Sequence, residues 1–242
     1  MWHVPHPALT AAGRTPMVIV RLLGGLGNQM FQYAAGRRMA LANDVPLKRD
    51  LSWVSRSTQR SYALHGLSVQ EAFATPDELR EIHGPSARGV GRFLHRLRER
   101  FKIGDRWTRI HEAWLSPFDH RVLAAPERTY LDGYWQSEKY FSDVADTIRR
   151  EFTVKAPPDA RSREIGERIA ATESVSVHVR RGDYVSNPRV HRVHGTCTPD
   201  YYRRCEILIA RQLAHPHFFL FSDDPDWVAT NLRFEHPVTL AS

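Results

Sequence analysis

Two arginines stand directly after a run of alternating valines in VSVHVRRGDYV, residues 175–185. The alternation of valine with polar residues is typical of a half-buried β-strand, so both arginines follow the carboxyl end of that strand. Alternation places His178 and Arg180 on one side and Arg181 on the other, which indicates different tasks for the two arginines. We expect one guanidinium to grip phosphate oxygens and the other to pair with Asp183 and fix the loop. A surface Arg–Asp pair without a ligand is the alternative.

A second group of polar residues follows the apolar run HFFLF, in FSDDPDWV. A carboxylate at the end of a strand accepts hydrogen bonds from a ribose or from a guanine edge in nucleotide sites. Ser222, Asp223 and Asp224 are therefore candidates for contact with a nucleotide. Asp224 is better placed to cap the helix that we expect to begin at Pro225, which leaves Asp223 as the freer candidate.

A glycine-rich turn, RLLGGLGNQMFQYAAG, joins an expected strand to an expected helix. Gly25 and Gly27 allow close approach of the backbone to a ligand, and the helix start presents free N–H groups to an anion. The spacing matches neither the dinucleotide fingerprint nor the P-loop, because the third glycine and the Lys-Ser/Thr pair are missing. A purely structural turn is the alternative, although Asn28 and Gln29 place polar side chains at its exit.

Aromatic and polar residues are mixed in GYWQSEKYF, residues 133–141. Tyr134 and Trp135 are candidates for stacking on a sugar, although aromatic residues at this density more often pack in the core.

His191, His194 and Cys197 have the spacing H-x2-H-x2-C, which superficially resembles a set of metal ligands. No fourth ligand stands at a suitable spacing, so the sequence predicts no metal. Cys197 and Cys205 are the only cysteines, which fits a reducing compartment rather than a disulfide scaffold.

Composition and charge narrow the class of protein. The chain has 242 residues, 42% hydrophobic and 25% charged, with a formal net charge of +7, which describes a globular protein with an anionic partner. Basic and apolar residues share the segment 88–109, which predicts a cationic amphipathic helix. Its basic side is either a solvated face or a contact with an anionic membrane surface. No apolar stretch approaches the roughly 20 residues that cross a bilayer.

Periodicity predicts alternating strands and helices. A strand at 17–23, a glycine turn and a helix from Asn28 open a βαβ unit. Helices are expected at 143–151 and 160–170 and from the TPD sequence at 198–200, and KAPPDA is the best linker. The expected organisation is a loose extension (1–16), a first half (17–155), a linker and helix (156–172) and a second half (173–242).

Four motifs carry a family resemblance. IVRLLGGLGNQMFQYAAGRRMA, LDGYWQSEKYF, VSVHVRRGDYV and PHFFLFSDDPDW, in this order, closely resemble the bacterial α-1,2-fucosyltransferases of glycosyltransferase family 11. The likeness runs from Met17 to about Leu232, and four motifs in register are highly specific. It implies an α/β fold with two Rossmann-like halves of GT-B type, in which the second half holds the nucleotide and the first half the acceptor.

The resemblance also implies an activity. The expected reaction is a metal-independent, inverting transfer of L-fucose from GDP-β-L-fucose to the 2-hydroxyl of a terminal galactose, without a cofactor. The acceptor is then a galactose-terminated glycan or polysaccharide precursor. Nucleic acid is not expected as a partner. The expected location is the cytoplasm, with a peripheral position at the inner membrane as the alternative.

Roles follow from the resemblance residue by residue. Arg180 would contact the donor diphosphate, with His178 and Arg181 beside it. Asn28 would lie near the reacting groups, so Arg180 and Asn28 are the catalytic candidates. Asp223 and Asp224 would face the guanosine. Asp183, Ser222, Gly25 and Gly27 complete the donor candidates, and Gln29, Tyr134 and Trp135 are candidates on the acceptor side.

The sequence departs from the family pattern after FEHPVTLAS, where the family continues into a motif rich in Asn, Ser, Thr, Phe and Trp. We therefore expect a second half that lacks its final strands and helices. A catalytically inactive remnant, or a basic module that binds a membrane or nucleic acid, is the alternative to an active enzyme.

Overall fold

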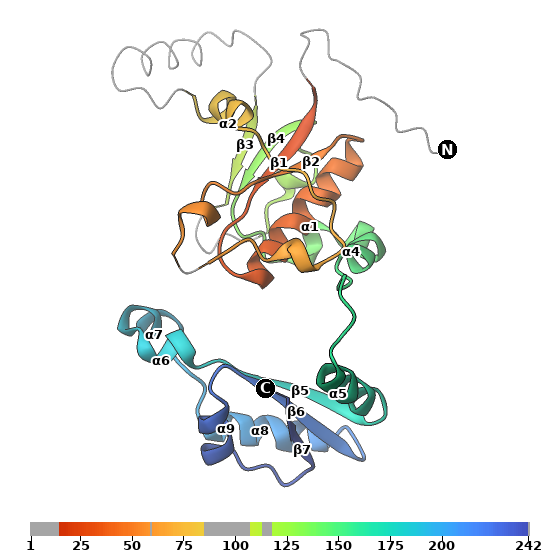
Figure 1. Ribbon diagram of the computed structural model, residues 1–242, viewed down its shortest axis with the longest axis vertical. Coiled ribbons are helices and arrows are strands. Elements are labelled where there is room, and N and C mark those ends of the chain that lie inside the picture. The colour runs from red at the N-terminus through yellow and green to blue at the C-terminus, as the bar shows by residue number, and fades with distance from the viewer. Residues whose placement is uncertain (1–14, 59, 85–106, 113–117, 242) are drawn as a thin grey trace. The chain divides into compact units, whose positions relative to one another are not determined.

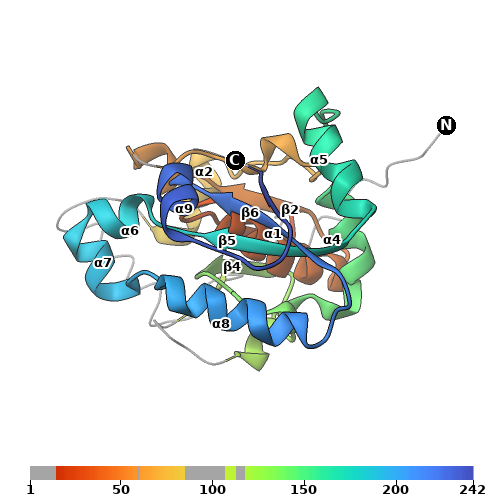
Figure 2. The same ribbon diagram turned by 90° about the horizontal axis from the view of Figure 1, so that it is seen from below.

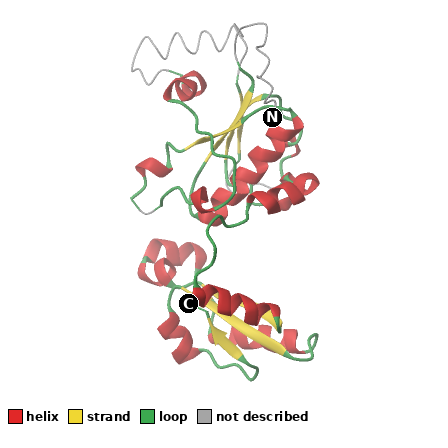
Figure 3. Cartoon of the chain, turned by 45° about the vertical axis from the view of Figure 1, so that its right-hand side comes forward, coloured by secondary structure: helices red, strands yellow, loops and turns green. Residues whose placement is uncertain are grey.

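The computed structural model describes residues 15–58, 60–84, 107–112 and 118–241. The chain divides between Ala156 and Pro157 into two compact units, here unit 1 (residues 1–156) and unit 2 (residues 157–242). Each unit has a sheet of its own, drawn in yellow in Figure 3, with helices packed against it. Both sheets are parallel, so the fold is mixed α/β.

The sheet of unit 1 has helices packed on both of its faces. Its longer elements are β1 (Met17–Arg21), α1 (Leu26–Ala42), β2 (Leu47–Asp50), α2 (Pro76–His83), β3 (Thr108–His111), β4 (Arg128–Asp132) and α4 (Ala145–Glu151). Short 3₁₀ helices span Val54–Arg56, Leu64–Gly66, His120–Val122, Glu138–Tyr140 and Ser142–Val144.

The described strands of unit 1 have the order β2-β1-β4-β3. On one face, Val18 and Val20 of β1 pack against Tyr33 and Met39 of α1. On the other face, Ile19 packs in a cluster with Ile82 of α2, and Figure 1 labels α2 beside the sheet. In the strand order, β1 has the next strand of the chain, β2, as its neighbour on one side and the later strand β4 as its neighbour on the other side. The carboxyl ends of β1 and β4 therefore form the kind of switch point at which α/β sheets bind ligands.

Unit 2 follows the same plan with a smaller sheet. Its elements are α5 (Ala160–Ala170), β5 (Glu173–Val179), α6 (Gly182–Ser186), α7 (Pro188–His194), α8 (Pro199–Ala210), β6 (Pro216–Ser222), α9 (Pro225–Asn231) and β7 (Val238–Leu240). The described strands have the order β5-β6-β7. Tyr202 of α8 and Val228 of α9 pack with Val179, Phe218 and Leu220 of the sheet. In Figures 1 and 2, α5 lies beside the beginning of β5.

Several predicted elements are confirmed, and one lies almost wholly outside the described residues. The strand near 17–23, the helix at 160–170 and the helix that begins after Thr198 are β1, α5 and α8. Of the basic segment 88–109, residues 88–106 lie outside the described residues. Thr108 and Arg109 are the first residues of β3, so the end of this segment is a strand and not a helix.

Two further sequence predictions concern the N-terminal extension and helices that could cross a membrane. Residues 1–14 of the predicted extension lie outside the described residues. Among the helices that the structure describes, none is both long and apolar enough to cross a membrane.

Candidate functional site

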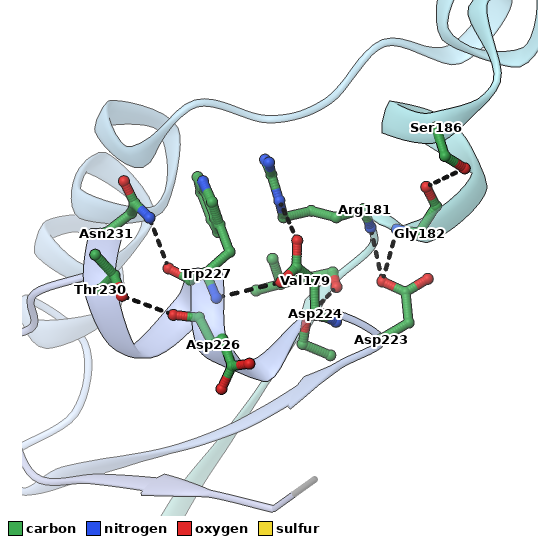
Figure 4. A network of polar contacts seen from close by, with 11 residues as sticks. Val179, Arg181, Gly182, Ser186, Asp223, Asp224, Asp226, Trp227, Thr230 and Asn231 are labelled. Carbon is green, nitrogen blue, oxygen red and sulfur yellow. Dashed lines mark hydrogen bonds and ion pairs between the residues drawn. The ribbon is translucent and has the colours of Figure 1, made fainter.

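In unit 2, the polar residues that the sequence singled out meet at the carboxyl ends of β5 and β6. The two strands are parallel neighbours and Val179 pairs with Ser222 at their last positions. The Ser222 hydroxyl donates to the Val179 carbonyl at 2.8 Å and accepts from the Asp224 N–H at 3.0 Å. Ser222 therefore ties the two strand ends together, and Figure 4 shows Val179 and Asp224 of this region from close by.

Asp223 braces the turn that follows β5. Its Oδ1 accepts the backbone N–H groups of Arg181 at 2.8 Å and Gly182 at 3.2 Å, while its Oδ2 lies 2.9 Å from Arg180 Nη1. Partial burial acts to raise the pKa of the Asp223 carboxyl, but these N–H groups and the Arg180 charge hold that pKa below its usual value. Asp223, the freer of the two candidate acids in the sequence, therefore already binds within the turn, and its contact with a nucleotide stays a prediction.

Gly182 allows this close approach. A Cβ atom added at Gly182 would lie 2.7 Å from Asp223 Oδ2, which is too close for a carbon–oxygen contact. A glycine at this position thus leaves the space that the Asp223 carboxylate occupies.

Arg180 lies between two carboxylates and remains accessible. Its Nη2 donates to Asp183 Oδ1 at 2.5 Å, its Nη1 pairs with Asp223, and its Cζ lies 5.5 Å from the centre of the Tyr184 ring. The side chain keeps 36% of its surface exposed. The sequence left open which arginine pairs with Asp183, and the structure assigns this pair to Arg180.

Arg181 points elsewhere and belongs to the packing of unit 2. Its Nε donates to Asp224 Oδ2 at 3.0 Å, and its Cζ stacks 3.8 Å from the centre of the Trp227 ring, with only 16% of the side chain exposed. Asp224 Oδ1 accepts the Trp227 N–H at 3.2 Å and caps α9, so the predicted capping role of Asp224 is confirmed. Figure 4 shows Arg181 and Trp227 side by side above Asp224.

Tyr184 was missed by sequence reasoning. Its ring stacks on His194 with centroids 4.8 Å apart, and its carbonyl oxygen lies 2.8 Å from His191 Nδ1. Both histidines of the H-x2-H-x2-C pattern thus contact Tyr184. Among the described residues, no three His, Cys, Asp or Glu side chains gather as metal ligands. His178, on β5 opposite Phe221, is exposed.

In unit 1, the glycine turn joins β1 to α1 at the switch point. Gly24 has a φ of +71°, and a Cβ atom there would lie 2.3 Å from Asn28 Nδ2, so this position requires glycine. Added Cβ atoms at Gly25 and Gly27 would meet nothing within 4 Å. The start of α1 has no side-chain cap and no acidic residue in its first turn, so no side chain caps its first N–H groups.

Asn28 and Gln29 have different surroundings. Asn28 Oδ1 accepts from Gln136 Nε2 at 2.7 Å, and Gln136 belongs to the segment after β4. Gln29 is fully buried. It donates to the carbonyls of Gly24 and Ser61 at 3.0 and 2.9 Å and accepts the Ala63 N–H at 2.9 Å. Gln29 therefore holds the turn in place and is not available to an acceptor, which corrects its predicted role.

The segment after β4 is held by Glu112, a residue that no sequence motif singled out. Glu112 Oε2 accepts the N–H groups of Tyr134 at 2.5 Å and Trp135 at 2.9 Å. Trp135 adopts a φ of +54°, is fully buried and packs edge-on against Tyr140. Its ring belongs to the core, which corrects its candidacy for sugar stacking. Tyr134 is partly exposed.

The chain is similar in sequence to known glycosyltransferases. The model of Glycosyl transferase family 11 matches residues 94–241. An Alpha-1,2-colitosyltransferase of Escherichia coli is 33% identical over 87% of this chain and 70% of that protein. A Galactoside 2-alpha-L-fucosyltransferase of Caenorhabditis elegans is 34% identical over 44% of this chain and 29% of that protein. The chain belongs to glycosyltransferase family 11.

A solved structure is distantly similar to this chain. The crystal structure of NodZ alpha-1,6-fucosyltransferase soaked with GDP-fucose is 16% identical, with a TM-score of 0.43 over 94% of this chain and 78% of that chain.

Proposed function

We propose that this chain transfers L-fucose from GDP-β-L-fucose to the 2-hydroxyl of a terminal galactose, with inversion at the sugar carbon. Membership of glycosyltransferase family 11 supports the reaction class. The observation that carries the proposal is the accessible Arg180 guanidinium, held by Asp183 and Asp223 at the strand ends of unit 2. Unit 2 is proposed as the donor half and unit 1 as the acceptor half of a GT-B fold.

The proposed role of Arg180 follows from the charge that develops in the reaction. The galactose hydroxyl attacks the anomeric carbon of fucose, and the bond to the β-phosphate oxygen breaks with its electron pair on GDP. The hydroxyl proton passes to solvent water as the new bond forms, so the products are the fucoside, GDP and a hydrated proton. A preorganised cation beside the departing diphosphate stabilises this charge, which typically contributes about 2.7–4 kcal/mol. The proposal gives this task to arginine rather than to a divalent ion.

Asn28 is proposed to lie near the reacting groups from unit 1. Its amide is oriented by Gln136 at 2.7 Å, and open space lies beyond Gly25 and Gly27. An amide in this position would orient a sugar hydroxyl by hydrogen bonds. Tyr134, partly exposed on the neighbouring segment, is the remaining aromatic candidate for stacking on the acceptor.

A second candidate concerns the donor sugar. The relative that is 33% identical over 87% of this chain is named a colitosyltransferase. Colitose is fucose without its 3-hydroxyl, so the same site chemistry serves either sugar. Rates measured with GDP-fucose and GDP-colitose at equal concentrations decide between the two donors.

The test combines turnover with binding. Incubation with GDP-fucose and a terminal-galactose acceptor should release GDP and form an α-1,2 linkage, with and without a chelator. GDP alone should raise the midpoint of thermal unfolding, since a ligand of the native state stabilises it. Absence of both turnover and stabilisation would contradict the proposal, and loss of turnover with the chelator would contradict metal independence. Salt-sensitive binding of nucleic acid or vesicles that survives Arg180→Ala would support the basic-module alternative.

A further inference from the structure

Unit 1 has a pocket of about 280 Å³ at the carboxyl edge of its sheet. The pocket lies between the end of β1 and the segment that follows β2. Its lining residues are Arg21, Ser52, Trp53, Arg56, Ser57 and Thr58. None of these residues was a candidate from the sequence.

Arg21 has hydrogen-bonding capacity to spare. Its Nη1 donates to both carboxylate oxygens of Asp132, at 3.2 and 3.1 Å. Its Nε is buried and has no hydrogen-bond partner within the described residues. Because a guanidinium carries five N–H donors and Asp132 takes one nitrogen, Arg21 can bind a second acceptor.

Arg56 adds a second positive charge to the same pocket. It is exposed, and no carboxylate pairs with its guanidinium in the part of the chain that the structure describes. Asp132 already pairs with Arg21, whereas Arg56 has no such partner among the described residues. The pocket wall therefore keeps one uncompensated positive charge.

The carboxylates of Asp50 and Asp132, at the ends of β2 and β4, already have hydrogen-bond or ion-pair partners. Asp50 accepts from the Tyr130 hydroxyl and from the Ser52 N–H, both at 2.7 Å. Asp132 pairs with Arg21 and lies 3.3 Å from His111 Nε2. Neither is left to neutralise Arg56, so the pocket favours an anionic ligand.

The remaining wall is suited to a sugar ring. The partly buried Trp53 offers an aromatic surface, and Ser52 and Thr58 contribute hydroxyl groups beside the two guanidinium groups. Aromatic stacking with hydroxyl and bidentate arginine contacts is the chemistry that binds a sugar carrying a carboxylate or phosphate.

We propose that this pocket binds an anionic substituent, the carboxylate of an acidic sugar or a phosphate, on the acceptor next to its terminal galactose. This inference depends on the proposed function, because it assigns the acceptor to unit 1. It makes the pocket a determinant of acceptor choice, with Arg56 and Arg21 as the residues that select for negative charge.

Three matched acceptors test the proposal: galactosyl-glucose, galactosyl-glucuronic acid, and galactosyl-glucose 6-phosphate. With GDP-fucose as donor, one or both charged acceptors should have a KM about tenfold below that of the neutral one, the advantage expected for one charge-assisted contact. Arg56→Ala should raise the KM for the charged acceptor about tenfold and for the neutral acceptor far less, with kcat changed less than about twofold. Arg56→Lys should recover part of the loss, because lysine keeps the charge without the fork.

The control variant is Arg149→Ala, which removes the same charge from the exposed side of α4 and should change no KM. Equal effects of Arg56→Ala on neutral and charged acceptors would overturn the proposal, as would a lack of preference for charge. The two charged acceptors separate carboxylate from phosphate recognition.

Calorimetric titration of the three acceptors without donor gives a readout that does not need turnover. Tighter binding of a charged acceptor, lost in Arg56→Ala and weakened by salt, supports the pocket even where no sugar is transferred. Failure of transfer to every acceptor, together with no stabilisation by GDP, contradicts the proposed function, whereas turnover or binding without charge preference contradicts only the pocket.

Discussion

The Arg180 guanidinium lies 2.9 Å from the Asp223 carboxylate, although the two residues follow different strands of unit 2. The same carboxylate accepts the N–H groups of Arg181 and Gly182, so it joins the turn after β5 to the end of β6. Arg180 is thus fixed before any ligand arrives. A fixed charge requires little reorganisation during a reaction, which is the condition for effective electrostatic stabilisation.

Loss of Arg180 should remove catalysis without unfolding unit 2. Arg180→Ala is expected to lower kcat/KM for fucosyl transfer by about 100- to 1,000-fold, the usual effect of deleting one preorganised donor. Arg180→Lys should restore little, since lysine has no planar fork. Steady-state kinetics and GDP-dependent thermal shifts measure both effects. Arg211→Ala, at the exposed end of α8, is the control and should behave as the parent protein.

Gly182→Ala should damage the same site indirectly. The new Cβ atom would stand 2.7 Å from Asp223 Oδ2, so the carboxylate has to move and give up its contact with Arg180. We expect kcat/KM to fall about tenfold, equivalent to one charge-assisted hydrogen bond, with unfolding free energy lowered by about 1 kcal/mol.

Gly166→Ala is the matched control for this substitution. Gly166 lies in α5, where an added Cβ atom meets nothing within 4 Å. Alanine favours a helix over glycine by up to about 1 kcal/mol, so this variant should be as stable as the parent or more so, with unchanged kinetics. Equal kinetic losses in the two variants would argue against the role of the Asp223 contact.

The helices and strands that could be predicted are those whose signal lies within a short stretch of sequence. β1 and β6 are continuous apolar runs, and α8 begins with a threonine–proline start signal. Sequence reasoning missed β2, because LKRD shows neither an apolar run nor a simple alternation. Arg49 of β2 is buried only because it meets Tyr62 and the Ala72 carbonyl, which are distant in sequence. Such long-range partners leave no periodic signal.

The candidate site shows the same limit. The sequence located the two arginines and the two acids, because strand ends and acidic clusters can be identified locally. It did not assign their pairings. Asp223 meets the turn 41 and 42 residues earlier, and only the register between β5 and β6 determines that contact. Gln29 was likewise placed at the right turn but not recognised as buried, since Ser61 and Ala63 complete its hydrogen bonds.

The carboxylate of Asp223 should make stability depend on acid pH. Its native pKa is below the usual value, so the unfolded chain takes up this proton first as the pH falls below about 4. The contribution of Asp223 is present above that pH and is lost as the pH falls through the native pKa. Asp223→Asn should therefore be less stable than the parent at pH 7, by about 1 kcal/mol or less for a partly exposed pair.

Urea unfolding of the parent and Asp223→Asn at pH 7, 5 and about 3.5 measures this difference. The gap between the two proteins should be constant from pH 7 to 5 and should narrow in acid. Asp44→Asn, at an exposed turn of unit 1, is the control. A gap that widened in acid would show that the native pKa of Asp223 is raised instead.

Asn28 and Gln29 are neighbours whose substitutions should have opposite consequences. Gln29 is buried with three hydrogen bonds to the turn and to residues 61–63, so Gln29→Ala should lower the unfolding free energy by about 3 kcal/mol. Asn28 is half-buried, and the hydrogen bond of its side chain within the described residues is the one from Gln136, so Asn28→Ala should leave stability within about 0.5 kcal/mol of the parent.

The same pair separates folding from catalysis. Asn28→Ala should lower kcat by about 10- to 100-fold while GDP still stabilises the protein, because the lost amide would orient a reacting group and not the nucleotide. Gln136→Ala removes only the partner that orients Asn28, so its kinetic effect should have the same sign and be smaller. Denaturant unfolding and single-turnover kinetics on the three variants provide the comparison. An Asn28 variant with full kcat would exclude this side chain from the reaction and leave the turn with a structural role alone.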